Sequence, residues 1–289
     1  MHYIENKYLR VGIQEKGAEL SSIVHLATGQ EYMWEADPEF WGHHSSILFP
    51  IIGKVKNDQI HLEGKSYSIK QHGFARNETF DILDINKDRI CFQLLYTTEG
   101  QEDYPYRYEL QATYELEESA VHITYKVLHH GPQEMYFSIG AHPAFKCPLK
   151  AGEKRSDYQL VFEKEEVAHR HFIEGGLRTG ETQLVLNQEK VLPIDDHLFD
   201  KDALIFKDLA SNTVSLIHKS GRKVLDFGFG GFPYLGIWSR NEFAPFVCIE
   251  PWFGVADPLD GSNDFKSKEG VLSLAAEAEF ECRHSLRIY

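Results

Sequence analysis

Apolar and polar residues alternate with a period of two along much of the chain. In segment 106–116 the apolar positions are separated by charged or polar ones, and the alternation resumes at 121–127 after a polar turn at 117–119. Successive side chains of a β-strand point to opposite faces of the sheet. The pattern therefore predicts two half-buried strands that pair antiparallel through the turn.

The same period of two predicts further strands at 90–96 and at 280–288, and a folded-back pair within 213–226 that turns at Ser220 and Gly221. Almost no segment has helical spacing. Short strands separated by turns are typical of antiparallel sandwiches and barrels rather than of alternating strands and helices. The chain is therefore predicted to be all-β and antiparallel.

No segment of the chain has the composition of a linker between domains. Pro- or Ser-rich tracts, low-complexity stretches and fixed-period repeats are absent, so residues 1–289 are predicted to form a single domain. The least regular region is 150–193, where charged residues and glycines predict long loops around a strand at 158–162.

The chain is acidic, with 30 Lys and Arg against 44 Asp and Glu and a formal net charge of −14. Proteins that bind nucleic acid present clustered Lys and Arg to the phosphates, so no nucleic-acid partner is expected. The apolar run at 47–52 is too short to span a membrane, and the first 15 residues contain no apolar signal region. We expect a cytoplasmic protein without a membrane partner.

Neither a metal site nor a disulfide scaffold is predicted. The adjacent pairs 43–44 and 129–130 are both His-His, but neighbouring residues of a strand point to opposite faces, so neither pair can chelate one ion. The four cysteines lack a C-x-x-C pair and are expected to be buried and reduced. They are Cys91, Cys147, Cys248 and Cys282.

Three segments place polar, chemically active side chains among small, apolar or aromatic residues. The segments are 71–76, 138–145 and 234–252. The first groups Gln71, His72 and Arg76 around a glycine at the end of a predicted strand. Amide, imidazole and guanidinium groups at one point are suited to binding a polar ligand.

The other two segments supply a candidate acid and base. His142 lies between small residues and a proline, which restricts the backbone and leaves the ring room to reach a ligand. Glu250 ends an apolar strand between apolar neighbours, so burial is expected to raise its pKa toward a value useful for proton transfer.

Aromatic residues in the same segments, including Phe145 and Trp238, could cover the apolar face of a pyranose ring while polar groups hold its hydroxyls. The residues thus fit acid–base chemistry on a sugar. The alternative is that each is structural, because a strand histidine is often a hydrogen-bonded core residue and a glutamate before proline is often a strand end.

Motifs in the same order along nearly the whole chain resemble those of one family. They are GAELSS at 17–22, MW at 33–34, the segment 37–41, LFPIIG at 48–53, HGFAR at 72–76, HP at 142–143, FVCIEPW at 246–252, and residues 254–257. This set resembles the aldose 1-epimerase family, also described as galactose mutarotase-like, and more closely its LacX-like branch.

The resemblance implies an antiparallel β-supersandwich that interconverts the α and β anomers of an aldose without a cofactor. By this resemblance, Glu250 is the general base that takes the proton of the C1 hydroxyl, and His142 is the general acid that protonates the ring oxygen. His72 is similar to the family's second active-site histidine. Asp202 is similar to the aspartate that orients the substrate, with Asp200 as an open alternative.

The positively charged side chains of the chain differ in position from those of the galactose mutarotase pattern. The sugar-binding arginine of that pattern is absent near 57–58, so Lys54 or Arg76 could supply the charge. The Gln71 to Arg76 stretch is more similar to glucose-6-phosphate 1-epimerases, but the second arginine of that subgroup is absent near 42–44. One of the two parts of that subgroup's phosphate site is therefore present, and the other is absent.

Three hypotheses follow for a protein whose expected partner is a small sugar. The leading one is a cofactor-free isomerase, an aldose 1-epimerase acting on a free hexose such as galactose or glucose. A hexose-6-phosphate 1-epimerase is the second, and a non-catalytic carbohydrate-binding or sensing protein is the third. The net negative charge favours a neutral sugar over a phosphorylated one. The sequence leaves open whether the protein is a monomer or a homodimer.

Overall fold

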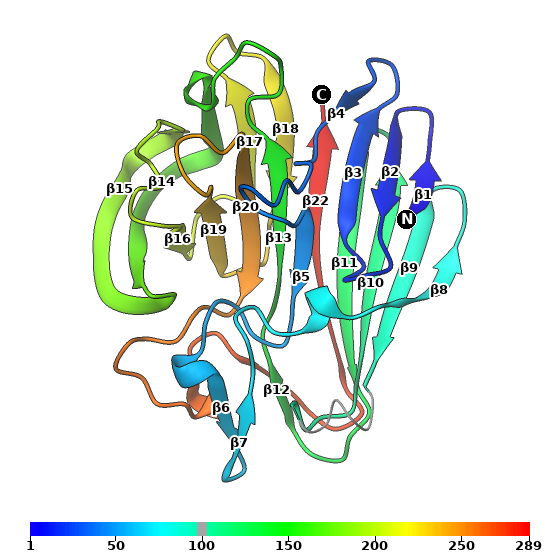
Figure 1. Cartoon of the computed structure of the whole chain (residues 1–289), viewed down its shortest axis with the longest axis vertical. Helices are drawn as coiled ribbons and strands as arrows, with labels where there is room; N and C mark the ends of the chain where they lie inside the picture. The colour runs from blue at the N-terminus through cyan, green and yellow to red at the C-terminus, as the bar shows by residue number, and fades with distance from the viewer. Residues whose placement is uncertain (97–102) are drawn as a thin grey trace.

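A computed structural model describes residues 1–96 and 103–289, and antiparallel strands dominate it (Figure 1). The all-β prediction is confirmed. Within these residues, no helix is both long enough and apolar enough to cross a membrane. The helical turns are short 3₁₀ segments: η1 (Lys56–Asp58), η2 (Ala75–Asn77), η4 (Arg155–Asp157) and η5 (Phe265–Ser267).

Fourteen strands of the described chain join in one large sheet. In spatial order they are β5 (Ser45–Leu48), β13 (Ile139–Lys146), β20 (Phe246–Phe253), β19 (Tyr234–Trp238), β16 (Leu204–Lys207), β14 (Tyr158–Glu174), β17 (Thr213–His218), β18 (Lys223–Gly228), β22 (Glu279–Ile288), β11 (Ala120–His129), β10 (Tyr108–Glu117), β9 (Arg89–Leu95) and β8 (Asp81–Ile85), with β15 (Leu177–Pro193) paired to β14.

The large sheet curls so that distant strands share one core. Phe145 of β13 and Phe227 of β18 are far apart in the strand order, yet their ring centroids lie 6.1 Å apart. Both belong to the main cluster of buried apolar side chains. Burying these faces against each other is the main stabilising contribution available to an all-β fold of this kind.

A second layer covers one arm of the large sheet (Figure 1). The phenol of Tyr114 on β10 donates a hydrogen bond of 2.6 Å to the carbonyl of Ala18 in this layer, and both residues are buried. The layer is a four-stranded sheet of β1 (His2–Glu5), β2 (Leu9–Ile13), β3 (Leu20–His25) and β4 (Gln30–Glu31). Two further sheets have two strands each: β6 (Gln59–Leu62) with β7 (Lys65–Ser68), and β12 (Met135–Phe137) with β21 (Leu272–Leu274).

The strands predicted from alternation are confirmed. β10 and β11 pair antiparallel in the expected register, with Glu117 opposite Ala120 at the turn. β9, the β17–β18 pair and β22 occupy the other predicted segments. The single domain over 1–289 stays a prediction, in keeping with the pairing of the C-terminal β22 with both β11 and β18.

The prediction of long loops across 150–193 is wrong. β14 and β15 are strands of 17 residues each that pair with each other and turn at Gly175 and Gly176. In the sheet described, β15 has β14 as its neighbour and is largely exposed, which explains its charged side chains. An exposed edge strand carries charge without losing its backbone pairing, so composition alone misled the prediction.

The chain makes one very close approach beside the predicted ligand-binding segment. Gly73, at φ 72°, lies so near the carbonyl of Phe49 that a Cβ there would stand 2.1 Å from its oxygen. The same carbonyl accepts the N–H of Phe74 at 3.0 Å. Only a residue without a side chain fits at this point, and the turn it permits carries the neighbouring His72 at φ 68°.

We predict that Gly73→Ala lowers the free energy of unfolding by about 3 kcal/mol or more, because it adds a backbone clash to the cost of a left-handed alanine. Urea unfolding monitored by tryptophan fluorescence measures the change. Gly29→Ala is the matched control, since Gly29 has φ 69° with nothing within 4 Å of its Cβ position. Equal losses in the two variants would contradict the steric explanation.

Candidate active site

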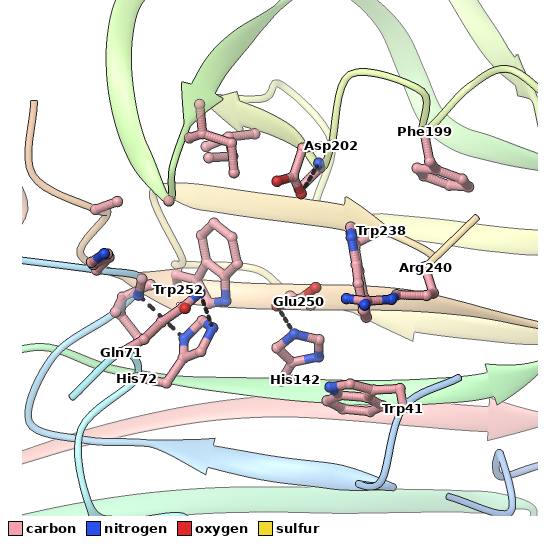
Figure 2. A pocket seen from close by; sticks show the side chains of 18 of the residues that line it. Trp41, Gln71, His72, His142, Phe199, Asp202, Trp238, Arg240, Glu250 and Trp252 are labelled. Atoms are coloured by element: carbon pink, nitrogen blue, oxygen red, sulfur yellow. Dashed lines mark hydrogen bonds and ion pairs between the residues drawn. The ribbon is translucent and has the colours of Figure 1, made fainter. Parts of the chain in front are cut away.

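Two neighbouring strands, β13 and β20, place His142 opposite Glu250. Their antiparallel register pairs Ala144 with Cys248, so the residues two positions further along face each other on the same side of the sheet. Nε2 of His142 lies 3.2 Å from a carboxylate oxygen of Glu250, and both side chains are buried (Figure 2). The imidazole and the carboxyl group are close enough to exchange a proton.

The indole of Trp252 lies beside Glu250 and depends on two glycines. Residues two apart on a strand share a face, so Trp252 joins Glu250 on the same side of β20. A Cβ at Gly140 would stand 2.8 Å from Cδ1 of the indole, and one at Gly236 would stand 2.5 Å from Cη2. The strands on either side of β20 therefore accommodate the ring only because these two positions lack side chains.

Burial moves the pKa values of the acid–base pair in opposite directions. Burial lowers the pKa of His142 well below its usual 6.5, and the neighbouring His72 and Arg76 lower it further. Burial raises the pKa of Glu250 well above its usual 4.5, and the nearby charge of Asp202 adds to the rise. The pair therefore favours a state that shares one proton and carries no net charge.

His72 presents a neutral ring from the loop after β7. The N–H of Gly53 donates to Nδ1 of His72 at 3.2 Å, and the backbone N–H of His72 donates to the Gly53 carbonyl at 2.9 Å. Burial lowers the pKa of His72 to about 3, and the charge of Arg76 acts in the same direction. A neutral imidazole that accepts at Nδ1 carries its proton on Nε2, which lies 3.4 Å from the side-chain amide nitrogen of Gln71, so His72 can donate a hydrogen bond to a ligand beside that amide.

An open cavity of about 670 Å³ lies in front of the pair, a volume suited to a small molecule. Figure 2 shows side chains from several separate segments around it. The lining residues are Trp41, Ile52, Gly53, Lys54, Gln71, His72, Arg76, His142, Ile173, Gly175, Gly176, Phe199, Asp200, Asp202, Ala203, Ile205, Trp238, Arg240, Glu250, Trp252 and Ala256.

Aromatic rings hold the imidazole of His142 on two sides. Trp41 stacks on it with centroids 4.5 Å apart and an interplanar angle of 25°, and Trp238 meets it edge-on at 5.7 Å. The two indoles are themselves 5.9 Å apart in an edge-to-face arrangement. These contacts fix the ring orientation and leave aromatic surface for the apolar face of a ligand.

Charged side chains of both signs line the cavity. Because the raised pKa of Glu250 favours its protonated form, three cations face two aspartates, and the site lacks the strong negative bias of the whole chain. Within the described residues, the three cations form no ion pair with a carboxylate. The cations are Lys54, Arg76 and Arg240, and the acidic residues are Asp200, Asp202 and Glu250.

Arg170 of β14 holds the loop that presents Asp202. One guanidinium nitrogen of Arg170 donates to the carbonyls of Lys201, Asp202 and Ala203 at 2.8, 3.0 and 3.3 Å. Asp202 itself adopts φ 67°, a conformation that needs such support in a residue other than glycine. Asp200 also lines the cavity, but its carboxylate accepts a hydrogen bond from His197 at 3.0 Å. The carboxylate of Asp202 likewise accepts one hydrogen bond, from the backbone N–H of Ala203 at 2.7 Å, so each aspartate keeps one oxygen available to a ligand.

A buried ion pair supports the opposite wall. Nζ of Lys268 lies 2.6 Å from a carboxylate oxygen of Asp257, and both side chains are 4% exposed. The other carboxylate oxygen accepts the N–H of Lys56 at 2.9 Å, and the N–H of Asp257 donates to the Lys54 carbonyl at 2.9 Å. Asp257 thus fixes the backbone at 53–56, which in turn bonds the ring of His72.

One predicted site residue lies outside the cavity. Phe145 is fully buried in the main core and packs against Phe227. The physical reason is the period of two along β13: residues 142 and 145 are three apart, so Phe145 points to the opposite face from His142. The other predicted residues line the cavity together: Lys54, Gln71, His72, Arg76, His142, Asp202, Trp238 and Glu250.

The site residues predicted from the sequence do not include Trp41, Phe199 or Arg240, which also line the cavity. Arg240 follows Trp238 by two positions, so the period of two could have placed it on the same side. Trp41 and Phe199 come from irregular segments, where no periodicity indicates direction. Their place at the cavity depends on tertiary packing alone.

The fold is that of galactose mutarotase-like proteins. A solved galactose mutarotase-like protein from Lactobacillus casei ATCC 334 superposes with a TM-score of 0.94 and 33% identity, covering 100% of both chains. A galactose mutarotase related enzyme from Lactobacillus acidophilus gives a TM-score of 0.94 and 32% identity over 100% of this chain and 97% of that one.

The chain belongs to the aldose 1-epimerase family, whose model, described as aldose 1-epimerase, matches residues 2–264. It is also 34% identical over 277 residues to the chromosomal protein LacX of Lactococcus lactis subsp. lactis, covering 93% of this chain and 92% of the relative. The family and the LacX-like branch predicted from the ordered motifs are thus confirmed, and a sugar-epimerase fold is established for the chain.

Proposed function

We propose that the protein is an aldose 1-epimerase that interconverts the α and β anomers of a free hexose such as galactose or glucose. The observation that carries this proposal is the buried contact of 3.2 Å between His142 and Glu250 at a cavity of small-molecule size. Family membership supports the same reaction class. We expect the reaction to take place in the cytoplasm, without a cofactor, in a monomer or homodimer.

The proposed reaction transfers two protons around one carbon. Glu250 takes the proton of the C1 hydroxyl while His142 gives a proton to the ring oxygen, and the bond between C1 and the ring oxygen breaks. The aldehyde rotates, and the reverse transfers close the ring on its other face. Both oxygens are bonded to C1, so acid and base must be neighbours, which is the arrangement of His142 and Glu250.

Groups around the pair bind and orient the sugar in this proposal. His72 donates from Nε2 to the ring oxygen or an adjacent hydroxyl, because its Nδ1 is occupied by Gly53. The carboxylate of Asp202 accepts hydrogen bonds from hydroxyl groups of the sugar. Trp238 offers aromatic surface to the apolar face of the ring.

The position of the shared proton is part of the mechanism. The forward step needs the proton on His142 and the negative charge on Glu250, whereas burial favours the uncharged arrangement. Hydroxyl groups of a bound sugar hydrogen-bond to the charged forms and reduce this penalty. Binding of the substrate therefore prepares the pair for the reaction.

We predict that Glu250→Gln and His142→Asn each reduce the rate of anomer exchange at least about 100-fold, since each removes one partner of the proton transfers. Polarimetry of freshly dissolved α-galactose and α-glucose measures the rate. His284→Asn is the matched control, because His284 is likewise buried on a strand but lies outside the cavity. Unchanged rates in both site variants would overturn the proposal, and sugar binding without any acceleration would indicate a binding or sensing protein.

We predict a bell-shaped dependence of kcat/KM on pH. Activity requires one proton on the pair, so it is lost when a second proton is added and when the last is removed. The acid limb reports the lowered pKa of His142 and lies below pH 6.5, and the alkaline limb reports the raised pKa of Glu250. Initial rates across pH in buffers of constant ionic strength test this. An acid limb centred above pH 7 would contradict the assignment.

A hexose-6-phosphate 1-epimerase is the second candidate. It is favoured by the unpaired cations Lys54, Arg76 and Arg240, together with Gln71, in the same cavity. Arg76 is partly buried, and one guanidinium nitrogen donates to the Gln71 carbonyl at 3.0 Å. The carboxylates of Asp200 and Asp202 in the same cavity oppose a phosphate, and the chain as a whole is acidic, so the free hexose takes precedence in our proposal.

We predict that kcat/KM for galactose or glucose equals or exceeds that for the corresponding 6-phosphate. The comparison is repeated with Arg76→Met, which removes one unpaired cation. A phosphate preference of about tenfold or more that disappears in this variant would replace the leading proposal with the second candidate.

A further inference from the structure

A cysteine, Cys248, lies beside the acid–base pair of His142 and Glu250, so three side chains able to bind a metal ion are close together. Cys248 precedes Glu250 by two residues on β20, so both side chains point to the same face. Cys248 pairs with Ala144, which follows His142 by two residues on β13. A ligand nitrogen of His142, the sulfur of Cys248 and a carboxylate oxygen of Glu250 all lie within 4.8 Å of one another. All three side chains are buried.

The cluster has free coordinating capacity. Among the described residues, Oε2 of Glu250 is buried without a hydrogen-bond partner, although it lies 3.2 Å from Nε2 of His142. His142 and Glu250 border the open cavity, whereas Cys248 lies behind them among apolar side chains. Three donors thus converge from one side and leave the cavity side open.

We propose that His142, Cys248 and Glu250 form an inhibitory site for a soft divalent cation such as Zn²⁺. The ion takes one nitrogen, one sulfur and one oxygen ligand, and its fourth position faces the cavity. Three protein ligands with one open position is a common arrangement for zinc. The prediction that the ion inhibits anomer exchange rests on the proposed function, whereas the prediction that the ion binds does not.

The distances suit tetrahedral zinc. Bonds of about 2.0–2.2 Å to nitrogen and oxygen put these atoms about 3.3 Å apart, close to the 3.2 Å between His142 and Glu250. A Zn–S bond of about 2.3 Å puts the sulfur about 3.6 Å from each of them. The sulfur of Cys248 is within 4.8 Å already, so a shift of at most about 1.2 Å completes the site.

The charge balance also suits a dication. A thiol and a carboxyl group must lose their protons to bind a metal ion. One Zn²⁺ displaces the thiol proton and the carboxyl proton, and the resulting thiolate and carboxylate neutralise it. Two protons are released to solvent, so binding strengthens as pH rises.

The ligand set predicts selectivity among metals. Thiolate and imidazole favour Zn²⁺, Cd²⁺ and Co²⁺, whereas Mg²⁺ and Ca²⁺ prefer sites made of oxygen. A bound ion occupies the lone pair of His142 and an oxygen of Glu250 and blocks the space where C1 of the sugar would lie. Zn²⁺ should therefore compete with the sugar, and Mg²⁺ should have no effect.

Binding is tested directly by titrating the protein with Co²⁺ and recording the absorption spectrum. We expect tetrahedral d–d bands together with a thiolate-to-cobalt charge-transfer band, and loss of both on addition of Zn²⁺. In Cys248→Ala the charge-transfer band should be absent. Cys147→Ala is the matched control, since Cys147 is equally buried but is not part of the cluster.

Inhibition is measured in parallel with the mutarotation assay. We expect Zn²⁺ to raise the apparent KM reversibly, with recovery after EDTA, and Cys248→Ala to keep the basal rate within about twofold while weakening inhibition at least about tenfold. Cys248→Ser serves if the alanine variant does not fold. A Co²⁺ spectrum without a thiolate band, or equal inhibition of the Cys248 variant, would overturn the site. A thiolate band in a protein without mutarotase activity would retain the metal site and reject the proposed function.

Discussion

The antiparallel pairing of β13 with β20 is the constraint on which the site depends. It sets His142 opposite Glu250 on the face of the sheet that borders the cavity and removes both from water. Isolated burial of either charge would be strongly unfavourable, but together the two groups can share one proton and stay neutral. The same register brings Cys248 next to the pair, so acid–base chemistry and metal coordination arise from one geometric relation.

Supports outside the cavity keep its walls in place. Arg170 binds three successive carbonyls beneath Asp202, and the buried Asp257–Lys268 pair fixes the backbone that bonds His72. Breaking a buried pair by removing one partner is costly, because the remaining charge has no compensation. Loops that carry binding residues are thereby held by polar contacts, while the strands that carry the reacting groups are held by the core.

The charge of the cavity differs from that of the chain. A net −14 favours a neutral ligand in bulk, yet the lining has three cations against two aspartates, because the raised pKa of Glu250 favours its protonated form. Because Lys54, Arg76 and Arg240 lack ion-pair partners in the described structure, local charge rather than total charge governs which sugar binds.

The alternation of polar and apolar residues determined the strands around β10, β11 and β22, because a half-buried strand imposes that period wherever it lies. Polar residues in apolar segments likewise indicated His142 and Glu250. The pattern could not determine the β14–β15 hairpin, whose exposed edge tolerates charge, nor which face of β13 borders the cavity. Once His142 is on that face, the period of two places Phe145 on the other. Only the tertiary structure brought Trp41 and Phe199 to the cavity, because both come from irregular segments. Strand register and loop packing join residues far apart in sequence, and local periodicity carries no record of those contacts.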